Sequence, residues 1–182
     1  MKHPNIAGVV GSGVKDAKYI IGEYIEGVSA YAYLRNPSVP IGSPFILSMA
    51  RQTAAGLYYL HEQGVIHGSL KSKNVLIDRD NLVHLKDYGY LDSKDVIDRL
   101  DAQPQYLAPE VITGSAYTEK IDIYSFGMFL WELFTKQTPF IGLTANQIVD
   151  EIIYRQLRPE IPPTCPIVFE KLIRACWSTD PK

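Results

Sequence analysis

The sequence predicts an α+β fold in which a short N-terminal β-hairpin precedes a mainly α-helical body. Residues 1–25 are rich in β-forming side chains on either side of a glycine-containing segment. Apolar residues recur at helical spacing over 43–63, and further helical patterns follow at 119–134 and 167–177. The 182 residues, of which 46% are hydrophobic and 21% charged, have ordinary globular composition and a length natural for one domain.

The first predicted element is the hairpin. The stretches 6–10 (IAGVV) and 18–25 (KYIIGEYI) are β-rich and flank the turn-like segment 11–17 (GSGVKDA). The glycines of that segment are also a weak signal for a phosphate-binding loop. No helix start follows them, so a hairpin turn is the favoured interpretation.

The helix predicted over 43–63 has signals at both ends. Ser43 can cap its N-terminus, Pro44 suits its first turn, and Gly64 ends it. An apolar stripe runs along one face at three- and four-residue spacing: Ile46, Met49, Ala50, Thr53, Ala54, Leu57 and Leu60.

Shorter elements alternate with helices in the rest of the chain. Residues 65–91 combine short apolar runs with turns and predict small strands and loops, and a polar stretch follows at 92–105. The segment 119–134 carries few charges and predicts a helix that is buried on most sides. Thr144 can cap another helix that runs to about Arg155.

Charge and cysteine content exclude several classes of protein. A net charge of −2 gives no basic field for nucleic acid or an anionic membrane. No apolar run approaches the roughly 20 residues that span a bilayer, and the N-terminus lacks the apolar core of a signal peptide. The two cysteines, Cys165 and Cys176, fit a reducing compartment, so we expect a cytoplasmic protein or the cytosolic part of a larger one.

Seven short motifs occur in a fixed order along the chain: HPNI (3–6), IIGEYIEG (20–27), HGSLKSKN (67–74), DYG (87–89), YLAPE (106–110), DIYSFGMFLWELFT (122–135) and CWSTDP (176–181). Together they resemble a eukaryotic protein kinase domain, closest in style to the tyrosine-kinase-like and receptor-like group. The resemblance covers nearly the whole chain. It implies a protein-kinase-like fold in which residues 1–27 are a remnant of the N-lobe with its fourth and fifth strands and hinge. Residues 28–182 would be the C-lobe without its final helix.

The resemblance also implies a site for ATP and Mg²⁺. Asn74 and Asp87 stand at the two metal-binding positions, and Lys71 stands at the position of the lysine beside the transferred phosphate. Three further residues match positions that contact the nucleotide: Glu23, Ile25 and Leu76. The resemblance gives Asp122 a structural role, because the matching aspartate holds the backbone of the catalytic loop.

The sequence departs from the family at the position that matters most for chemistry. Ser69 occupies the place of the catalytic aspartate, and a neutral hydroxyl cannot accept a proton at neutral pH. A general base contributes about 10²- to 10⁴-fold to a rate. Gly68 replaces the arginine that precedes this aspartate, and Gln103 replaces a threonine that touches it in serine/threonine kinases.

Elements of the family pattern are also missing at both ends of the sequence. The glycine-rich loop, the N-lobe lysine and its glutamate partner would precede residue 1, so we expect ATP binding to be weak or absent in this chain. The arginine that normally pairs with the glutamate at position 110 would follow residue 182.

These departures predict a catalytically impaired pseudokinase that works as a signalling scaffold or allosteric binding module. Its partners would be proteins that bind the helix G region, Thr144 to Arg158, and the activation segment. Two alternatives stay open. One is an active ATP-dependent serine/threonine or tyrosine kinase whose N-lobe is absent from this chain, and the other is a truncated, non-functional gene product.

Overall fold

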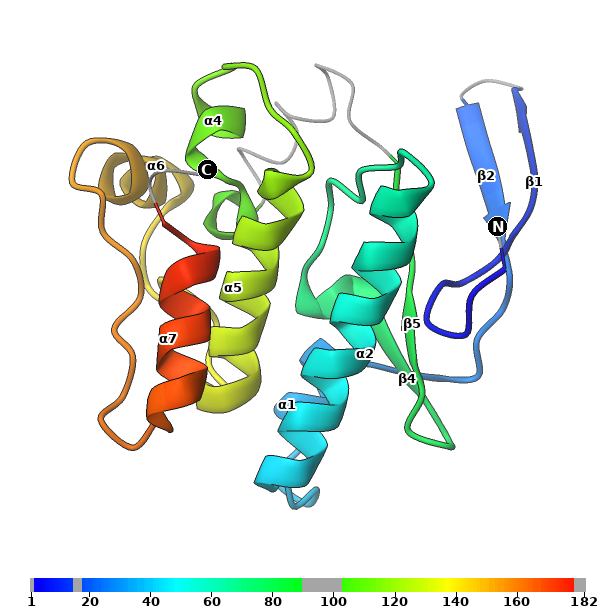
Figure 1. Ribbon diagram of the computed structural model, residues 1–182, viewed down its shortest axis with the longest axis horizontal. Helices are drawn as coiled ribbons and strands as arrows, with labels where there is room; N and C mark the ends of the chain where they lie inside the picture. Colours follow the sequence, from blue (N-terminus) through cyan, green and yellow to red (C-terminus); the bar gives the residue numbers. More distant parts are fainter. Residues whose placement is uncertain (1, 15–17, 90–102, 179–182) are drawn as a thin grey trace. The chain divides into compact units, whose positions relative to one another are not determined.

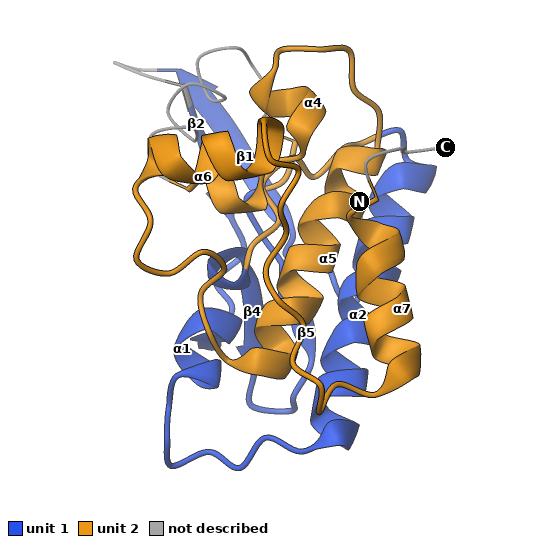
Figure 2. Cartoon of the chain, turned by 90° about the vertical axis from the view of Figure 1, so that its left-hand side faces the viewer, with its two compact units in different colours: residues 1–64, 72–87 blue, residues 65–71, 88–182 orange. Residues whose placement is uncertain are grey.

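The computed structural model describes residues 2–14, 18–89 and 103–178 (Figure 1). The chain forms two compact units, each built from two stretches of sequence (Figure 2). Unit 1 comprises Met1–Gly64 and Ser72–Asp87, and unit 2 comprises Val65–Lys71 and Tyr88–Lys182. This division reflects contacts within the chain, whereas the predicted boundary after residue 27 separates family lobes and stays a prediction.

Unit 1 contains two small antiparallel sheets. β1 (Val9–Val14) pairs with β2 (Lys18–Gly22), which confirms the predicted hairpin. The second sheet has three strands in the order β3 (Gly27–Ser29), β4 (Val75–Asp78) and β5 (Val83–Leu85). β3 is far in sequence from β4 and β5, so residues after 72 complete a unit that begins at the N-terminus.

The prediction of the first strand at 6–10 was wrong in its limits. Ile6 forms a parallel bridge with Leu85, and the Ala7 amide donates to the Leu85 carbonyl at 2.9 Å. Ile6 and Ala7 are both buried, whereas most residues of β1 are exposed. The apolar start of the predicted strand therefore joins the better buried sheet, and residues 11–14 of the predicted turn become strand instead.

The long helix α2 (Ser43–Glu62) confirms the predicted segment. Its N-cap is Gly42 rather than Ser43, because Ser43 is already helical and no side chain caps this end. Pro44 lies in the first turn, and Gly64 follows the helix at φ +69°, where the absence of a side chain avoids strain. The buried residues of α2 include most of the predicted stripe: Met49, Ala50, Thr53, Gly56, Leu57 and Leu60.

The short helix α1 (Ala30–Leu34) and strand β3 were not predicted. The Ser29 hydroxyl caps α1 by accepting a hydrogen bond from the Ala32 amide at 3.2 Å. This serine was a signal that could have located the helix. A 3₁₀ turn, η1 (Ser72–Asn74), contacts α1 and leads into β4.

Two amide side chains attach the N-terminal segment to the rest of unit 1. The Asn5 amide donates to the Val83 carbonyl at 2.9 Å and to the Gln52 Oε1 at 3.1 Å. Gln52 Oε1 in turn accepts from the Val83 amide at 2.9 Å. This network joins the segment before β1 to α2 and β5, and it satisfies polar groups that would otherwise be buried without partners.

The β4–β5 turn contains a carboxylate with three hydrogen bonds. Asp78 accepts from the Asp80 and Leu82 amides, each at 2.9 Å, and from His84 Nε2 at 2.9 Å. We expect Asp78→Ala to lower the free energy of unfolding at pH 7 by about 1–3 kcal/mol, because it removes hydrogen bonds to a charged group. Urea unfolding measures this difference, and Asp80→Ala, an exposed carboxylate in the same turn, is the matched control.

The effect of Asp78→Ala should depend on pH. Burial acts to raise the pKa of Asp78, but the hydrogen bonds from His84, Leu82 and Asp80 outweigh it and hold the pKa below its ordinary value of 3.8. The stabilisation is therefore complete above pH 3.8 and is lost as the pH falls through the lower folded value. A difference between wild type and variant that stays equal at pH 7 and pH 3 would contradict this assignment.

Unit 2 is mainly helical. Its elements are the 3₁₀ turn η2 (Pro104–Tyr106), α4 (Pro109–Ile112), α5 (Lys120–Thr135), α6 (Ala145–Ile153) and α7 (Ile167–Cys176). The predicted helices at 119–134 and 167–177 are confirmed. α7 packs alongside α5, which is buried on most sides as predicted (Figure 1).

Both tryptophans, Trp131 and Trp177, are buried in unit 2. Trp131 also donates from Nε1 to the Glu160 carbonyl at 2.8 Å, so its one polar group is satisfied. Within the described ranges, no helix is long and apolar enough to cross a membrane.

The predicted cap of α6 is confirmed. Thr144 and Gln147 form a reciprocal capping box, in which each side chain bonds to the backbone of the other residue. The helix ends at Ile153, before the predicted limit at Arg155, because Gln156 has a left-handed backbone (φ +53°) that turns the chain away.

Candidate functional site

The loop 65–71 is fixed by a buried carboxylate. The backbone amides of His67 and Gly68 donate to the two carboxylate oxygens of Asp122, each at 2.7 Å. Asp122 is fully buried in the first turn of α5. Gly68 has φ +68°, a conformation that glycine adopts without strain. The predicted structural role of Asp122 is therefore confirmed, and the loop has a defined backbone rather than the strand geometry suggested for its apolar start.

His67 acts as a scaffold residue inside this loop. Its side chain is buried, its Nδ1 accepts from the Ser69 amide at 3.3 Å, and its carbonyl accepts from the Gly89 amide at 3.1 Å. The ring also lies edge-on to Tyr88, with 6.3 Å between centroids. These contacts tie the loop to residues 88–89 within unit 2.

Ser69 lines a small cavity of about 20 Å³ in unit 2. The cavity also contacts Lys71 and Gln103. The structure therefore brings together Ser69 and Gln103, the residues that the resemblance matches to the catalytic aspartate and to the threonine beside it. The Gln103 Oε1 atom is buried and has no hydrogen-bond partner among the described residues. A volume of about 10–15 Å³ holds one water molecule, so this cavity can take one. Among the described residues that line it, none has a carboxylate.

The wall behind this cavity is a buried hydrogen-bonded network. Ser125 donates from its hydroxyl to the Tyr106 carbonyl at 2.7 Å, and the Tyr106 hydroxyl donates to Glu132 Oε2 at 2.8 Å. Tyr106 and Glu132 are both buried. Tyr106 is therefore a packed residue of unit 2.

The two predicted metal ligands belong to unit 1. Asn74 is buried at the end of η1, and its carbonyl accepts from the Lys86 amide at 3.0 Å, next to Asp87. An amide oxygen and a carboxylate are hard ligands of the kind that Mg²⁺ prefers, so the donor chemistry fits this ion. A bound Mg²⁺ would neutralise charge on the phosphates of ATP. In this structure the Asp87 carboxylate instead binds the Lys86 ammonium at 2.7 Å, a cation with which a metal must compete.

The three predicted nucleotide contacts also belong to unit 1. Glu23 is exposed and accepts from the Gly8 amide at 3.2 Å, Ile25 is half-buried, and Leu76 is half-buried on β4 opposite Ser29. Their assignment to ATP stays a prediction. The same holds for the catalytic assignments of Ser69 and Lys71, which lie in unit 2.

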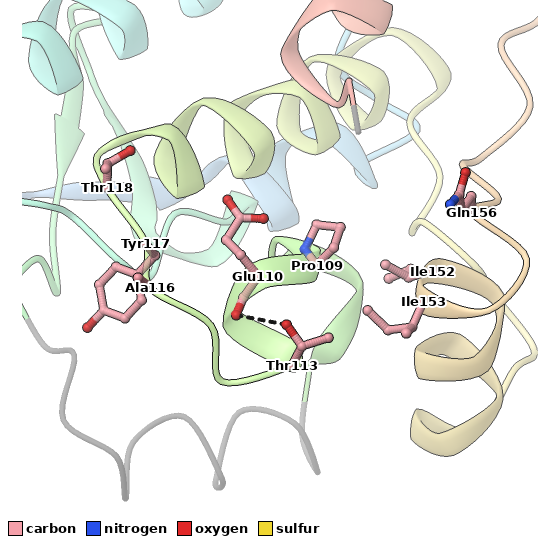
Figure 3. A pocket seen from close by; sticks show the side chains of 9 residues that line it. All are labelled: Pro109, Glu110, Thr113, Ala116, Tyr117, Thr118, Ile152, Ile153 and Gln156. Atoms are coloured by element: carbon pink, nitrogen blue, oxygen red, sulfur yellow. Dashed lines mark hydrogen bonds between the residues drawn. The ribbon is translucent and has the colours of Figure 1, made fainter. Parts of the chain in front are cut away.

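Sequence reasoning missed a groove between α4 and α6 (Figure 3). Its volume is about 340 Å³, and residues 109–118 form one wall while residues 152–156 form the other. The second wall falls within the predicted partner surface, Thr144 to Arg158. No local pattern marks the first wall, because the groove exists only where two segments far apart in sequence lie side by side.

Comparison with known proteins gives a consistent result over the full chain. A family model described as protein tyrosine and serine/threonine kinase matches residues 1–182. The probable serine/threonine-protein kinase drkC of Dictyostelium discoideum is 37% identical over 192 residues, which cover all of this chain and 26% of that protein. Mitogen-activated protein kinase kinase kinase 7 of Drosophila melanogaster is 36% identical, and the match covers all of this chain and 28% of that protein.

A third relative carries a different description. A probable inactive serine/threonine-protein kinase of Dictyostelium discoideum is 34% identical over 197 residues, which cover all of this chain and 16% of that protein. This chain therefore spans between 16% and 28% of the length of these three relatives.

Proposed function

The chain belongs to the protein tyrosine and serine/threonine kinase family, and we propose that it is a catalytically impaired member, a pseudokinase that acts by binding other proteins. One observation carries the proposal. The catalytic-loop backbone is fully anchored by Asp122, yet the side chain at the position of the general base is the neutral hydroxyl of Ser69. The loop thus has the backbone contacts to Asp122 but has no carboxylate at the position of the general base.

The surroundings of Ser69 support the same conclusion. Kinase catalysis depends mainly on positioning and charge neutralisation, and an aspartate in this loop accepts the proton of the substrate hydroxyl. Gln103, which faces the same cavity, is uncharged and cannot replace that carboxylate at neutral pH. Lys71 adds a positive charge beside the site but no acceptor.

The alternative is an active kinase that uses ATP and Mg²⁺, and a specific observation favours it. Asn74 and Asp87 keep a donor set that suits Mg²⁺, and Lys71 keeps its place in the loop. Among the relatives described above, two are named as kinases and one as probably inactive, so the family itself accommodates both outcomes.

A phosphotransfer assay separates the two proposals. We expect the full-length protein, incubated with radiolabelled Mg·ATP and myelin basic protein, to incorporate no phosphate beyond that of an Asp87→Asn control. We expect the same of Ser69→Asp, because Gly68 and Gln103, which line the same cavity, also differ from the family pattern. Incorporation by wild type that requires Asp87, or a gain of about 10²-fold or more in Ser69→Asp, would support the active kinase instead.

The proposed partner surface is the region Thr144 to Arg158 together with the activation segment. Large apolar side chains are exposed in or beside this region, including Ile141, Tyr154, which is 80% exposed, and Leu157. Exposed apolar and aromatic side chains favour protein interfaces. We also propose an intracellular location, because Cys165 and Cys176 are both free thiols, as a reducing compartment would keep them.

A further inference from the structure

The pairing of β4 with β5 brings three residues of unit 1 to one end of this strand pair (Figure 1). Val75 lies opposite Leu85. The next residues outward, Asn74 and Lys86, are therefore neighbours, and the Lys86 amide donates to the Asn74 carbonyl at 3.0 Å. Asp87 follows directly and has a left-handed backbone (φ +58°). Lys86 thus lies beside both of the predicted metal ligands.

The side chain of Lys86 is accessible and reaches Asp87. Residues 83–86 alternate between buried and partly exposed, as in a strand with one face in the core, so the Lys86 side chain lies on the accessible face. Its Nζ lies 2.7 Å from Asp87 Oδ2. An exposed ion pair of this kind adds little to stability. Its consequence is that a positive charge already contacts the carboxylate that a metal ion would need.

A divalent ion at Asp87 would bind against two opposing effects. Mg²⁺ binds oxygen ligands at about 2.0–2.1 Å, so it must displace the ammonium from Oδ2. The displaced ammonium also stays close, because its backbone is held next to the site. Even in bulk water, the repulsion between a divalent ion and a unit charge about 5 Å away corresponds to roughly a tenfold loss of affinity.

The same positive charge can act directly on phosphate. In phosphoryl-transfer enzymes Mg²⁺ neutralises the negative charge on the phosphates of ATP. A lysine ammonium is a compact point charge that binds phosphate without a metal ion. Lys86 carries such a charge at the metal position, and 37% of its side chain is exposed, so a ligand can reach it.

We infer that Lys86 takes the place of Mg²⁺ at Asp87, so that this chain excludes divalent ions from the site and binds a nucleoside triphosphate in its metal-free form. The ammonium would pair with the phosphates when nucleotide is bound and with Asp87 when it is absent. The inference goes beyond the proposed binding of proteins. It rests on the metal positions that the resemblance gives to Asn74 and Asp87, and it depends on Lys86 rather than on Ser69.

The first test uses Mn²⁺ alone as a paramagnetic probe of the metal site, because Mn²⁺ shares the oxygen ligands of Mg²⁺. In NMR spectra of the ¹⁵N-labelled protein, broadening of the Asn74 and Asp87 amide signals should require at least about 10-fold more Mn²⁺ in wild type than in Lys86→Gln. Adding Asp87→Asn to Lys86→Gln should abolish the broadening, which locates the ion.

Two further variants are matched controls. Lys86→Arg keeps the positive charge and should require as much Mn²⁺ as wild type. Lys171→Gln removes the same charge at an exposed site on α7 and should also leave the Mn²⁺ dependence unchanged. Because all of these side chains are at least partly exposed, a fold defect would change the spectrum throughout and not the signals near the site alone.

The second test is calorimetric titration with ATP in EDTA and in excess Mg²⁺. Wild type should bind ATP in EDTA at least as tightly as in Mg²⁺, because Lys86 already supplies the cation. Lys86→Gln should bind ATP at least about 10-fold more weakly in EDTA, since it has lost that charge, and Mg²⁺ should restore its affinity.

Three results would overturn the inference. They are an equal Mn²⁺ dependence of wild type and Lys86→Gln, an ATP affinity of wild type that rises at least about 10-fold in Mg²⁺, and no binding of ATP with or without the metal. Each would leave the pseudokinase proposal standing, because that proposal is tested by phosphotransfer and by Ser69→Asp. Phosphate incorporation that requires Asp87 would refute the pseudokinase, while the two titrations would still report on Lys86.

Discussion

Replacement of Asp122 by alanine is expected to have the largest effect on stability. The substitution leaves the buried amides of His67 and Gly68 without acceptors, after the loss of two charge-assisted bonds of 2.7 Å. Each hydrogen bond to a charged group contributes about 1.5–3 kcal/mol, so the loss is about 3–6 kcal/mol. That is a large fraction of the roughly 5–15 kcal/mol by which domains are stable. Urea unfolding followed by circular dichroism measures it.

Hydrogen exchange locates the effect of the Asp122 variant. The variant Asp122→Asn keeps the side-chain volume but places an NH₂ group against one of the two amide donors. If the carboxylate holds the loop, the backbone amides of His67 and Gly68 should be the first to lose protection from exchange in this variant. Asp150→Asn on the exposed face of α6 is the control and should change stability by no more than about 0.5 kcal/mol. Unchanged exchange at both loop amides would show that other contacts hold the backbone.

Gly127→Ala is expected to destabilise unit 2, although alanine normally favours a helix. A Cβ atom at position 127 would lie 2.7 Å from Cys176 Cβ and 3.4 Å from the Ile173 carbonyl oxygen, both on α7. Helix propensity alone would stabilise the variant by about 0.5–1 kcal/mol. Overpacking of a close helix contact costs about 1–3 kcal/mol, so the clash should win. Thermal or urea unfolding gives the sign directly.

A double-mutant cycle with Cys176 tests the cause of this destabilisation. Burial raises the pKa of Cys176 to about 11, so the thiol is uncharged at neutral pH and the cycle changes packing alone. Cys176→Gly removes the clashing Cβ and should recover at least about 1 kcal/mol of the Gly127→Ala loss, whereas Cys176→Ala keeps that atom and should recover little. Equal recovery by both would mean that the sulfur, not the Cβ, limits the approach of the helices.

Sequence patterns were sufficient where the determining interactions are local. The stripe over 43–63, the apolar segment 119–134 and the Thr144 cap each depend on residues within a few turns of one another, and all three were predicted. The hairpin was also predicted, but Ile6 was assigned to it wrongly. The partner of Ile6 is Leu85, and no local rule indicates a bridge across so many residues.

In the candidate site, too, local features were predictable from the sequence and contacts between distant segments were not. The order of the seven motifs was sufficient to recognise the family, because the family follows from residue identity at fixed spacing. The assignment of Ser69 to the position of the catalytic aspartate depends on the same spacing and stays a prediction. The role of Asp122 was implied by the family and confirmed by its two short bonds to the loop.

Thus the sequence by itself determined the main helices and the family. The tertiary structure alone decided that Ser69 and Gln103 line one cavity and that Glu110 lies in an apolar groove facing α6. The physical reason is the sequence separation over which the determining interactions act. Propensity, capping and periodicity act over a few residues, whereas a cavity or groove depends on which distant segments pack together and which polar groups are left without partners.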